Sequence, residues 1–129
     1  MIYGIGTDLV EMSRIERLLE QYGERFARRV LTDDEWPTYL NSSKPAMFLA
    51  GRFAAKEAFS KAMGTGFRHP VSLGNISVAH DHLGKPYFAF HPALEMLVKN
   101  EGIIGHHLSI SNEATLVCAF VVLETKLEK

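Results

Sequence analysis

The longest helical pattern in the chain lies near its middle. An alanine-rich stretch begins at Pro45 and stops at Gly64, which predicts one helix with a clear end. At about 100° per residue, one arc of this helix collects small and aromatic side chains. These are Phe48, Ala54, Ala55, Ala58, Phe59 and Ala62. The opposite arc is polar, with Arg52, Lys56, Glu57, Ser60 and Lys61. We expect the first face to pack and the second to have a polar role.

Alternation with a period of two predicts a strand over residues 2–10. Gly4, Gly6 and Asp8 share one of its faces, which is therefore unusually bare. Two glycines on one side of a strand indicate the close approach of another backbone or of a ligand. A strand that ends in a turn-forming aspartate explains the same residues.

Further elements follow from capping signals and periodicity. We expect a helix over residues 13–22, opened by a capping box at Ser13 and closed by Gly23, with a short helix after Thr32. The inner stripe of the helix over residues 13–22 should be Ile15, Leu18, Leu19 and Tyr22. The remaining elements are strands 76–80 and 87–90 around a loop, a helix over 92–100, and a hairpin of strands 107–111 and 115–124. Residues 118–123 should lie at the centre of the sheet. The pattern predicts an α+β fold, with an antiparallel sheet packed against the long central helix.

Composition limits the classes of function. A chain of 129 residues with 47% hydrophobic content fits one domain over residues 1–129. Its net charge of −1 excludes a general basic field for nucleic acids. Locally, residues 14–29 hold five arginines against three glutamates, a surplus of two positive charges. That segment is either a solvated helix surface or a docking surface for an acidic partner.

The single cysteine, Cys118, has apolar neighbours and is expected to be a buried, unreactive thiol in a reducing cytoplasm. The first ten residues lack a basic leader, so we expect no signal peptide, and no apolar run is long enough to span a membrane. Two histidine pairs invite a zinc hypothesis, but neither has a third ligand at a recognised spacing. The pairs are His80 with His82 and His106 with His107.

Candidate chemistry is concentrated on the central helix. Phe53, Glu57 and Lys61 are spaced i, i+4, i+8, which brings an acid and a base together beside an aromatic ring. An ordinary surface ion pair has the same spacing, so spacing does not decide between the two. Packing this helix across the first strand would bring Asp8 to Glu57. Two carboxylates, completed by phosphate oxygens and waters, are a set that Mg²⁺ prefers.

Four motifs together resemble those of the 4′-phosphopantetheinyl transferases, and the chain from Met1 to Glu124 resembles their small holo-acyl-carrier-protein synthase branch. The central motif is residues 52–61, Arg-Phe-Ala-Ala-Lys-Glu-Ala-Phe-Ser-Lys, followed by Gly64-Thr65-Gly66. The others are Gly6-Thr7-Asp8, Gly84-Lys85-Pro86 and the histidine-containing strand at 107–111.

The resemblance implies transfer of 4′-phosphopantetheine from coenzyme A to a serine of apo-acyl carrier protein, in support of fatty acid biosynthesis, with release of adenosine 3′,5′-bisphosphate. It also implies that Asp8 and Glu57 hold Mg²⁺ on the pyrophosphate. We expect Lys61 to balance charge on the diphosphate. Glu57 is the candidate to accept the serine proton, directly or through a metal-bound water.

Coenzyme A contacts are expected at residues that match the motifs or lie near them: Lys44, Arg52, Gly64, Thr65, Gly66, Lys85, Pro86 and His107. A helix cap explains the glycines equally well, and a plain loop lysine explains Lys44. The acidic carrier protein would meet Arg14, Arg17 and Arg25. The resemblance implies a homotrimer with active sites between subunits. The rival interpretations are another Mg²⁺-dependent phosphotransferase or nuclease, and a non-catalytic module that binds carrier proteins.

Overall fold

The computed structural model describes residues 1–126 and is organised around helix α4 (Pro45–Met63). Lys44 precedes its first turn, and Gly64 ends it in the left-handed conformation, with φ of 78°. The N–H of Gly64 donates to the carbonyl of Lys61. The predicted helix, with its proline start and glycine stop, is confirmed.

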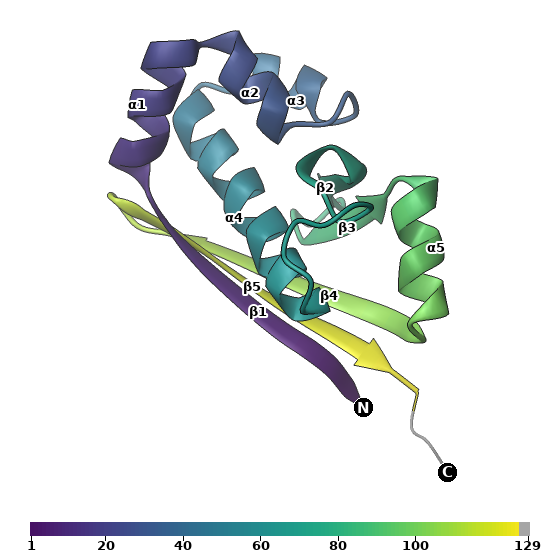
Figure 1. Cartoon of the computed structure of the whole chain (residues 1–129). Coiled ribbons are helices and arrows are strands. Elements are labelled where there is room, and N and C mark those ends of the chain that lie inside the picture. The colour runs from purple at the N-terminus through teal and green to yellow at the C-terminus, as the bar shows by residue number, and fades with distance from the viewer. Residues whose placement is uncertain (127–129) are drawn as a thin grey trace.

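Two antiparallel sheets accompany this helix (Figure 1). The larger has the order β1 (Ile2–Glu11), β5 (Leu116–Thr125) and β4 (Ile103–Asn112), so the apolar segment 118–123 lies in its central strand as predicted. The smaller sheet pairs β2 (Ile76–His80) with β3 (Pro86–Phe90). The α+β class is confirmed, with the strands divided between two sheets.

Helix α4 lies across one face of the larger sheet, and the glycines of β1 permit the contact (Figure 1). A Cβ atom added to Gly6 would lie 1.9 Å from the Ala58 carbonyl oxygen, and one added to Gly4 would lie 2.0 Å from that of Ala62. Both distances are far below van der Waals contact. The bare face of the predicted strand therefore admits another backbone, which belongs to the helix.

The shorter helices flank this unit. Helices α1 (Met12–Tyr22), α2 (Glu24–Val30) and α3 (Trp36–Leu40) surround the N-terminal half of α4, whereas α5 (Pro92–Asn100) packs on β3 and β4. A 3₁₀ turn, Leu73–Asn75, precedes β2. None of the helices described over residues 1–126 is long and apolar enough to cross a membrane.

Two local predictions are wrong, the capping box at Ser13 and the full burial of Cys118. The capping box at Ser13 does not form, because the Met12 N–H donates to the Thr115 carbonyl at 2.9 Å and α1 begins there without a side-chain cap. The polar arc of α4 has the polar role expected of it, since Arg52, Lys56 and Ser60 are buried and Lys56 donates to Glu35 and to the Leu73 carbonyl. Cys118 is only half-buried, because alternation along β5 turns it toward the face of the sheet opposite α4.

Candidate active site

Asp8, Glu57 and Lys61 meet where β1 passes under the C-terminal half of α4. Asp8 shares a face of β1 with Gly4 and Gly6, so its side chain is directed toward the helix. The Lys61 ammonium donates to Asp8 Oδ1 at 3.1 Å and to the Thr7 carbonyl at 3.0 Å. Lys61 therefore contacts Asp8, and the charges of both act on the carboxyl of Glu57, one helical turn before Lys61.

The two carboxylates act on each other electrostatically. Partial burial raises the pKa of Glu57 above its ordinary value, and the negative charge of Asp8 raises that pKa further. Lys61 and Arg14 oppose both effects. The negative charges of two carboxylates that are not deeply buried thus act on the same place, where they would favour a divalent cation.

The donor set fits Mg²⁺. Within residues 1–126, no group of three or more His, Cys, Asp or Glu side chains gathers around a common point. Mg²⁺ is commonly held by one or two carboxylates and completes its shell with waters and substrate phosphates. A pair such as Asp8 and Glu57 meets that requirement without a third protein ligand.

The raised pKa of Glu57 predicts a pH-dependent change in stability. Below its unfolded-state pKa of about 4.5, Glu57 is protonated in both states and exerts no effect; above the raised folded-state value, its charge disfavours the folded state. In metal-free buffer, Glu57→Gln should therefore raise the Tm at pH 7, and the difference should shrink as the pH falls below 4.5. Thermal denaturation at both pH values measures this, with Glu95→Gln, an exposed carboxylate on α5, as the control. An equal Tm change at the two pH values would contradict the assignment.

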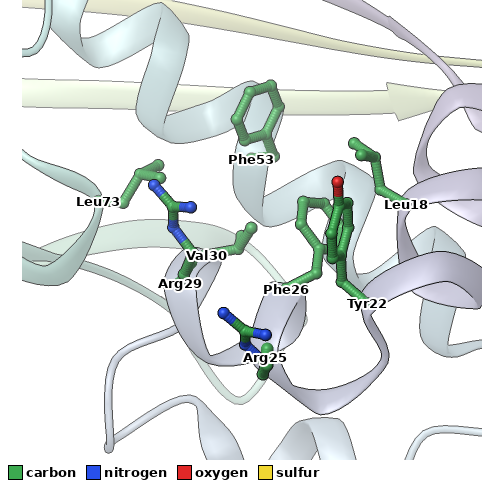
Figure 2. Close-up of a pocket in the computed structure, with 8 residues that line it drawn as sticks. All are labelled: Leu18, Tyr22, Arg25, Phe26, Arg29, Val30, Phe53 and Leu73. Atoms are coloured by element: carbon green, nitrogen blue, oxygen red, sulfur yellow. The ribbon is translucent and has the colours of Figure 1, made fainter.

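A groove with a volume of about 400 Å³ opens beside this site between α1, α2 and α4 (Figure 2). Figure 2 shows Phe53 entering it from α4 and Arg25 and Arg29 from α2. Its other lining residues are Leu18, Tyr22, Phe26, Val30 and Leu73. Apolar side chains thus form the groove, and two arginines extend along it.

The groove explains the position of part of the basic segment, residues 14–29. It also shows that the predicted inner stripe of α1 is only partly enclosed. Leu18 and Tyr22 line this open groove, and Tyr22 is about half-exposed, so these two residues are not enclosed. The Arg14 guanidinium lies 5.8 Å from the centre of the Phe53 ring, whereas Arg17 is exposed on α1 away from the lining. Because Phe53 is one helical turn before Glu57, the groove and the acidic site are neighbours.

A second cavity, also of about 400 Å³, lies at the N-terminal half of α4 and gathers three of the predicted coenzyme A residues: Lys44, Arg52 and Pro86. Lys85 is exposed in the adjoining loop, and His80 joins the lining. Partial burial and the positive charge of Arg52 lower the pKa of His80. Neither this cavity nor the groove includes Asp8 or Glu57 in its lining.

The other predicted coenzyme A residues lie elsewhere in the chain. Gly64 and Gly66 use their N–H groups on the Lys61 and Ser60 carbonyls, and the Thr65 hydroxyl donates to the Gly66 carbonyl at 2.8 Å. These bonds close the C-terminal end of α4 and use the N–H groups of both glycines. His107 lies on β4 on the face opposite α4, where its ring contacts the Glu124 carboxylate. In a single chain, the predicted coenzyme A residues therefore lie in three separate regions.

Sequence reasoning missed one buried group near the site, in which Glu35 contacts both Lys56 and Arg52. Glu35 stands three residues after Thr32 and was expected only to cap a short helix. It does accept from the Thr32 N–H at 2.9 Å, as in a capping box. Its burial at 3% exposure could not be inferred from that signal.

Known proteins are similar to this chain in sequence and fold over nearly its whole length. The family model of the 4′-phosphopantetheinyl transferase superfamily matches residues 4–119. A Nitrosospira multiformis protein named holo-[acyl-carrier-protein] synthase is 74% identical over 124 residues, which are 96% of this chain and 99% of the relative.

Two solved structures extend the likeness to three dimensions. The crystal structure of holo-[acyl-carrier-protein] synthase from Neisseria meningitidis has a TM-score of 0.95 at 51% identity, covering 97% of this chain and 100% of that one. The synthase from Bacillus anthracis in complex with CoA (3′,5′-ADP) has a TM-score of 0.81 at 41% identity, covering 98% and 99%. The chain therefore belongs to the holo-acyl-carrier-protein synthase family of the 4′-phosphopantetheinyl transferase superfamily.

Proposed function

We propose that this protein transfers 4′-phosphopantetheine from coenzyme A to a serine hydroxyl of an apo-acyl carrier protein. The observation that carries the proposal is the convergence of Asp8 from β1 with Glu57 and Lys61 from α4, at the positions of the family motifs. Residues 1–129 would form one domain of this kind. A cytoplasmic location and a role in fatty acid biosynthesis complete the proposal, and family membership and the single cysteine support them.

In this reaction the serine oxygen bonds to the phosphorus that carries pantetheine, and the bridging P–O bond breaks. Adenosine 3′,5′-bisphosphate leaves with the electron pair of that bond. Glu57 is the candidate to accept the serine proton, directly or through a water. Lys61, held by Asp8 and the Thr7 carbonyl, balances negative charge on the leaving group.

Asp8 and Glu57 are the residues that would hold Mg²⁺. When bound, the ion supplies neutralisation of charge on the diphosphate oxygens. The Lys61–Asp8 contact orients one carboxylate before substrate arrives, so less rearrangement is needed on binding.

Coenzyme A would place its nucleotide near the second cavity. Lys44, Arg52 and the exposed Lys85 supply positive charge for its phosphates, and Pro86 supplies an apolar wall. The Bacillus anthracis relative was solved in complex with CoA (3′,5′-ADP), which supports a nucleotide site in this fold. Gly64, Thr65, Gly66 and His107 remain candidates that a neighbouring subunit would bring to the same ligand.

A homotrimer with active sites between subunits is part of the proposal, and the uncovered face of the larger sheet supports it. Figure 1 shows α4 on one side of β1, β5 and β4 and no described element on the other. Leu9 on β1 is 63% exposed and Phe120 on β5 is 46% exposed, and both belong to that open face. Apolar sheet faces of this kind commonly mark protein interfaces.

Phe120→Glu tests this interface. Because it inserts a charge into the open sheet face, the mass measured by light scattering should fall from about three times the chain mass of 14.5 kDa toward that of one chain, with loss of transfer. Leu83→Glu, in the exposed loop between β2 and β3, is the matched control and should leave the mass unchanged. A monomeric wild-type protein with full activity would exclude the trimer.

The groove is the proposed docking surface for the acidic carrier protein. Its apolar lining suits the apolar side of a helix, and Arg25, with Arg14 nearby, suits acidic residues at the helix edge. Arg17 would contribute longer-range attraction from α1. Phe53 connects this surface to Glu57, so a serine carried by the docked protein would lie close to the proton acceptor.

Arg25→Glu should raise the KM for the carrier protein roughly tenfold at low salt, with little change in the KM for coenzyme A, because attraction becomes repulsion at the groove alone. The effect should shrink as ionic strength rises. Steady-state kinetics at two salt concentrations measure it. Arg25 is a cleaner position than Arg14, whose charge also acts on Glu57. Lys99→Glu, on the distant helix α5, is the control; an equal effect there would reject the docking surface.

The function is tested by incubating the protein with Mg²⁺, coenzyme A and an apo-acyl carrier protein. Mass spectrometry should show the carrier gaining the pantetheine arm, and a chelator or a carrier without the acceptor serine should abolish the gain. A carrier bound but unchanged would indicate a non-catalytic module. Thermal shift with coenzyme A, with and without Mg²⁺, identifies another kind of Mg²⁺-dependent phosphotransferase by the absence of stabilisation.

A further inference from the structure

The most deeply buried cation in the described chain takes no part in the proposed chemistry. Lys56 is fully buried, with 0% exposure, one position before Glu57 on α4. Its ammonium donates to the Val30 carbonyl at 2.6 Å, to Glu35 Oε1 at 2.7 Å and to the Leu73 carbonyl at 3.1 Å. An ammonium group has three donors, and all three are used.

Glu35, the partner of Lys56, connects its own loop to two other elements. Its Oε1 also accepts from the Thr32 N–H, while Oε2 accepts from the Val78 N–H of β2 at 2.9 Å. Oε2 lies 3.4 Å from Arg52 Nε, an ion-pair contact in which Nε forms no hydrogen bond. One carboxylate thus joins the loop before α3, strand β2 and helix α4.

The two sides of this pair face different sites. The carbonyls that Lys56 holds belong to Val30 and Leu73, which line the arginine-containing groove. The guanidinium beside Glu35 belongs to Arg52, which lines the cavity proposed for the nucleotide. The pair therefore lies between the surface proposed for the carrier protein and the cavity proposed for coenzyme A.

Stability alone does not account for such a pair. Desolvation of two buried charges costs about as much as their attraction returns, and apolar replacements are often neutral or stabilising. What the pair supplies is geometry: the three bonds of Lys56 join α4 to the segments of Val30, Glu35 and Leu73, and Glu57 is the next residue. Among the ion pairs described over residues 1–126, only those of Glu35 share one carboxylate, which pairs with Lys56 on the groove side and with Arg52 on the cavity side.

We propose that Lys56 and Glu35 form a positioning unit for the transfer reaction, with Lys56 setting the groove and Glu35 setting Arg52 in the nucleotide cavity. This inference rests on the proposed function. It assigns the two residues separable effects, because each makes direct contact with a different site. Neither residue touches substrate.

The test uses Lys56→Met and Glu35→Gln in the full chain. Lys56→Met removes the bonds to the groove carbonyls and should raise the KM for the carrier protein roughly tenfold, with a smaller effect on coenzyme A. Glu35→Gln weakens the contact with Arg52 and should raise the KM for coenzyme A by a similar factor, with a smaller effect on the carrier. The split between the two KM values is a readout that general loss of stability does not produce.

Two further variants separate the positioning role from a general loss of stability. Leu94→Ala, in the buried face of α5 away from both sites, should lower the Tm and leave both KM values unchanged. The double variant Lys56→Met with Glu35→Leu replaces both charged side chains by apolar ones and should keep both KM values raised.

Wild-type KM values in the double variant, or equal changes in Leu94→Ala, would overturn the proposal. If the wild-type protein shows no transfer, the proposed function fails instead. The positioning role is then read from the dissociation constants of coenzyme A and of apo-acyl carrier protein measured by calorimetry, where the same split is expected. Absence of that split would overturn the positioning role independently.

Discussion

Asp8→Asn is expected to lower the turnover of carrier-protein modification by roughly 10²–10³, with the fold intact. Asparagine keeps the shape of the side chain and removes its charge, so the site loses one of two anionic donors for the cation. Lys61 also loses its charged acceptor at 3.1 Å. Single-turnover mass spectrometry at saturating Mg²⁺ measures the chemical step directly, and Glu57→Gln should give a loss of similar size.

A second readout separates the electrostatic role of Asp8 from simple damage. The negative charge of Asp8 is one cause of the raised pKa of Glu57, so Asp8→Asn should lower that pKa toward its ordinary value. Carbon-detected NMR titration of the Glu57 carboxyl reports this. Asp33→Asn, an exposed aspartate outside the site, is the matched control for turnover and pKa. Near-normal turnover in Asp8→Asn would remove the basis for the metal assignment.

The elements that sequence predicted correctly are those with strong local signals. Helix α4 begins at Pro45 and is ended by Gly64. The alternation of β1 places Asp8 on the same face as the two glycines of that strand. Given those two elements, the meeting of Asp8 with Glu57 needed only that the helix cross the strand. The bare glycine face shows why it crosses there, since any side chain at Gly4 or Gly6 would prevent the approach.

The errors arose where distant segments decide the outcome. A helical wheel separates the two arcs of α4 but does not show what covers the polar arc, where Arg52, Lys56 and Ser60 are buried. The partner of Lys56 is Glu35, 21 positions away in the loop before α3, and no period links the two. The capping signal at Ser13 did not decide where α1 begins. The Met12 N–H instead donates to the carbonyl of Thr115, which is distant in the sequence.

The same division applies to the site. The catalytic candidates lie where one helix crosses one strand. The alternation of β1 and the helical spacing of α4 are therefore enough to locate them. The predicted coenzyme A residues came from motif position, which carries no information on distance; Lys44 and Pro86 share a cavity, whereas His107 lies on the opposite face of the larger sheet. The groove depends on how α1 and α2 pack beside Phe53, which their separate patterns do not specify.

Gly6→Ala is expected to be among the most damaging single substitutions in the chain. The added methyl group would lie 1.9 Å from the Ala58 carbonyl oxygen and 2.7 Å from the Ala62 nitrogen, and both atoms are backbone atoms of α4. A flexible side chain could move aside, but a buried helix backbone cannot do so without separating from the sheet. We expect a loss of more than about 4 kcal/mol in the free energy of unfolding, enough to unfold many domains of this size.

Denaturant unfolding followed by circular dichroism measures this loss, with Gly74→Ala as the matched control. Gly74 has no neighbouring atom within 4 Å of an added Cβ, so its substitution should change the free energy of unfolding by less than about 1 kcal/mol. Because Gly6 lies two residues before Asp8 on the same face, any folded Gly6→Ala protein should also separate Asp8 from Lys61 and lose transfer activity. A stable, active Gly6→Ala variant would mean that the contact between β1 and α4 does not set the geometry of the acidic site.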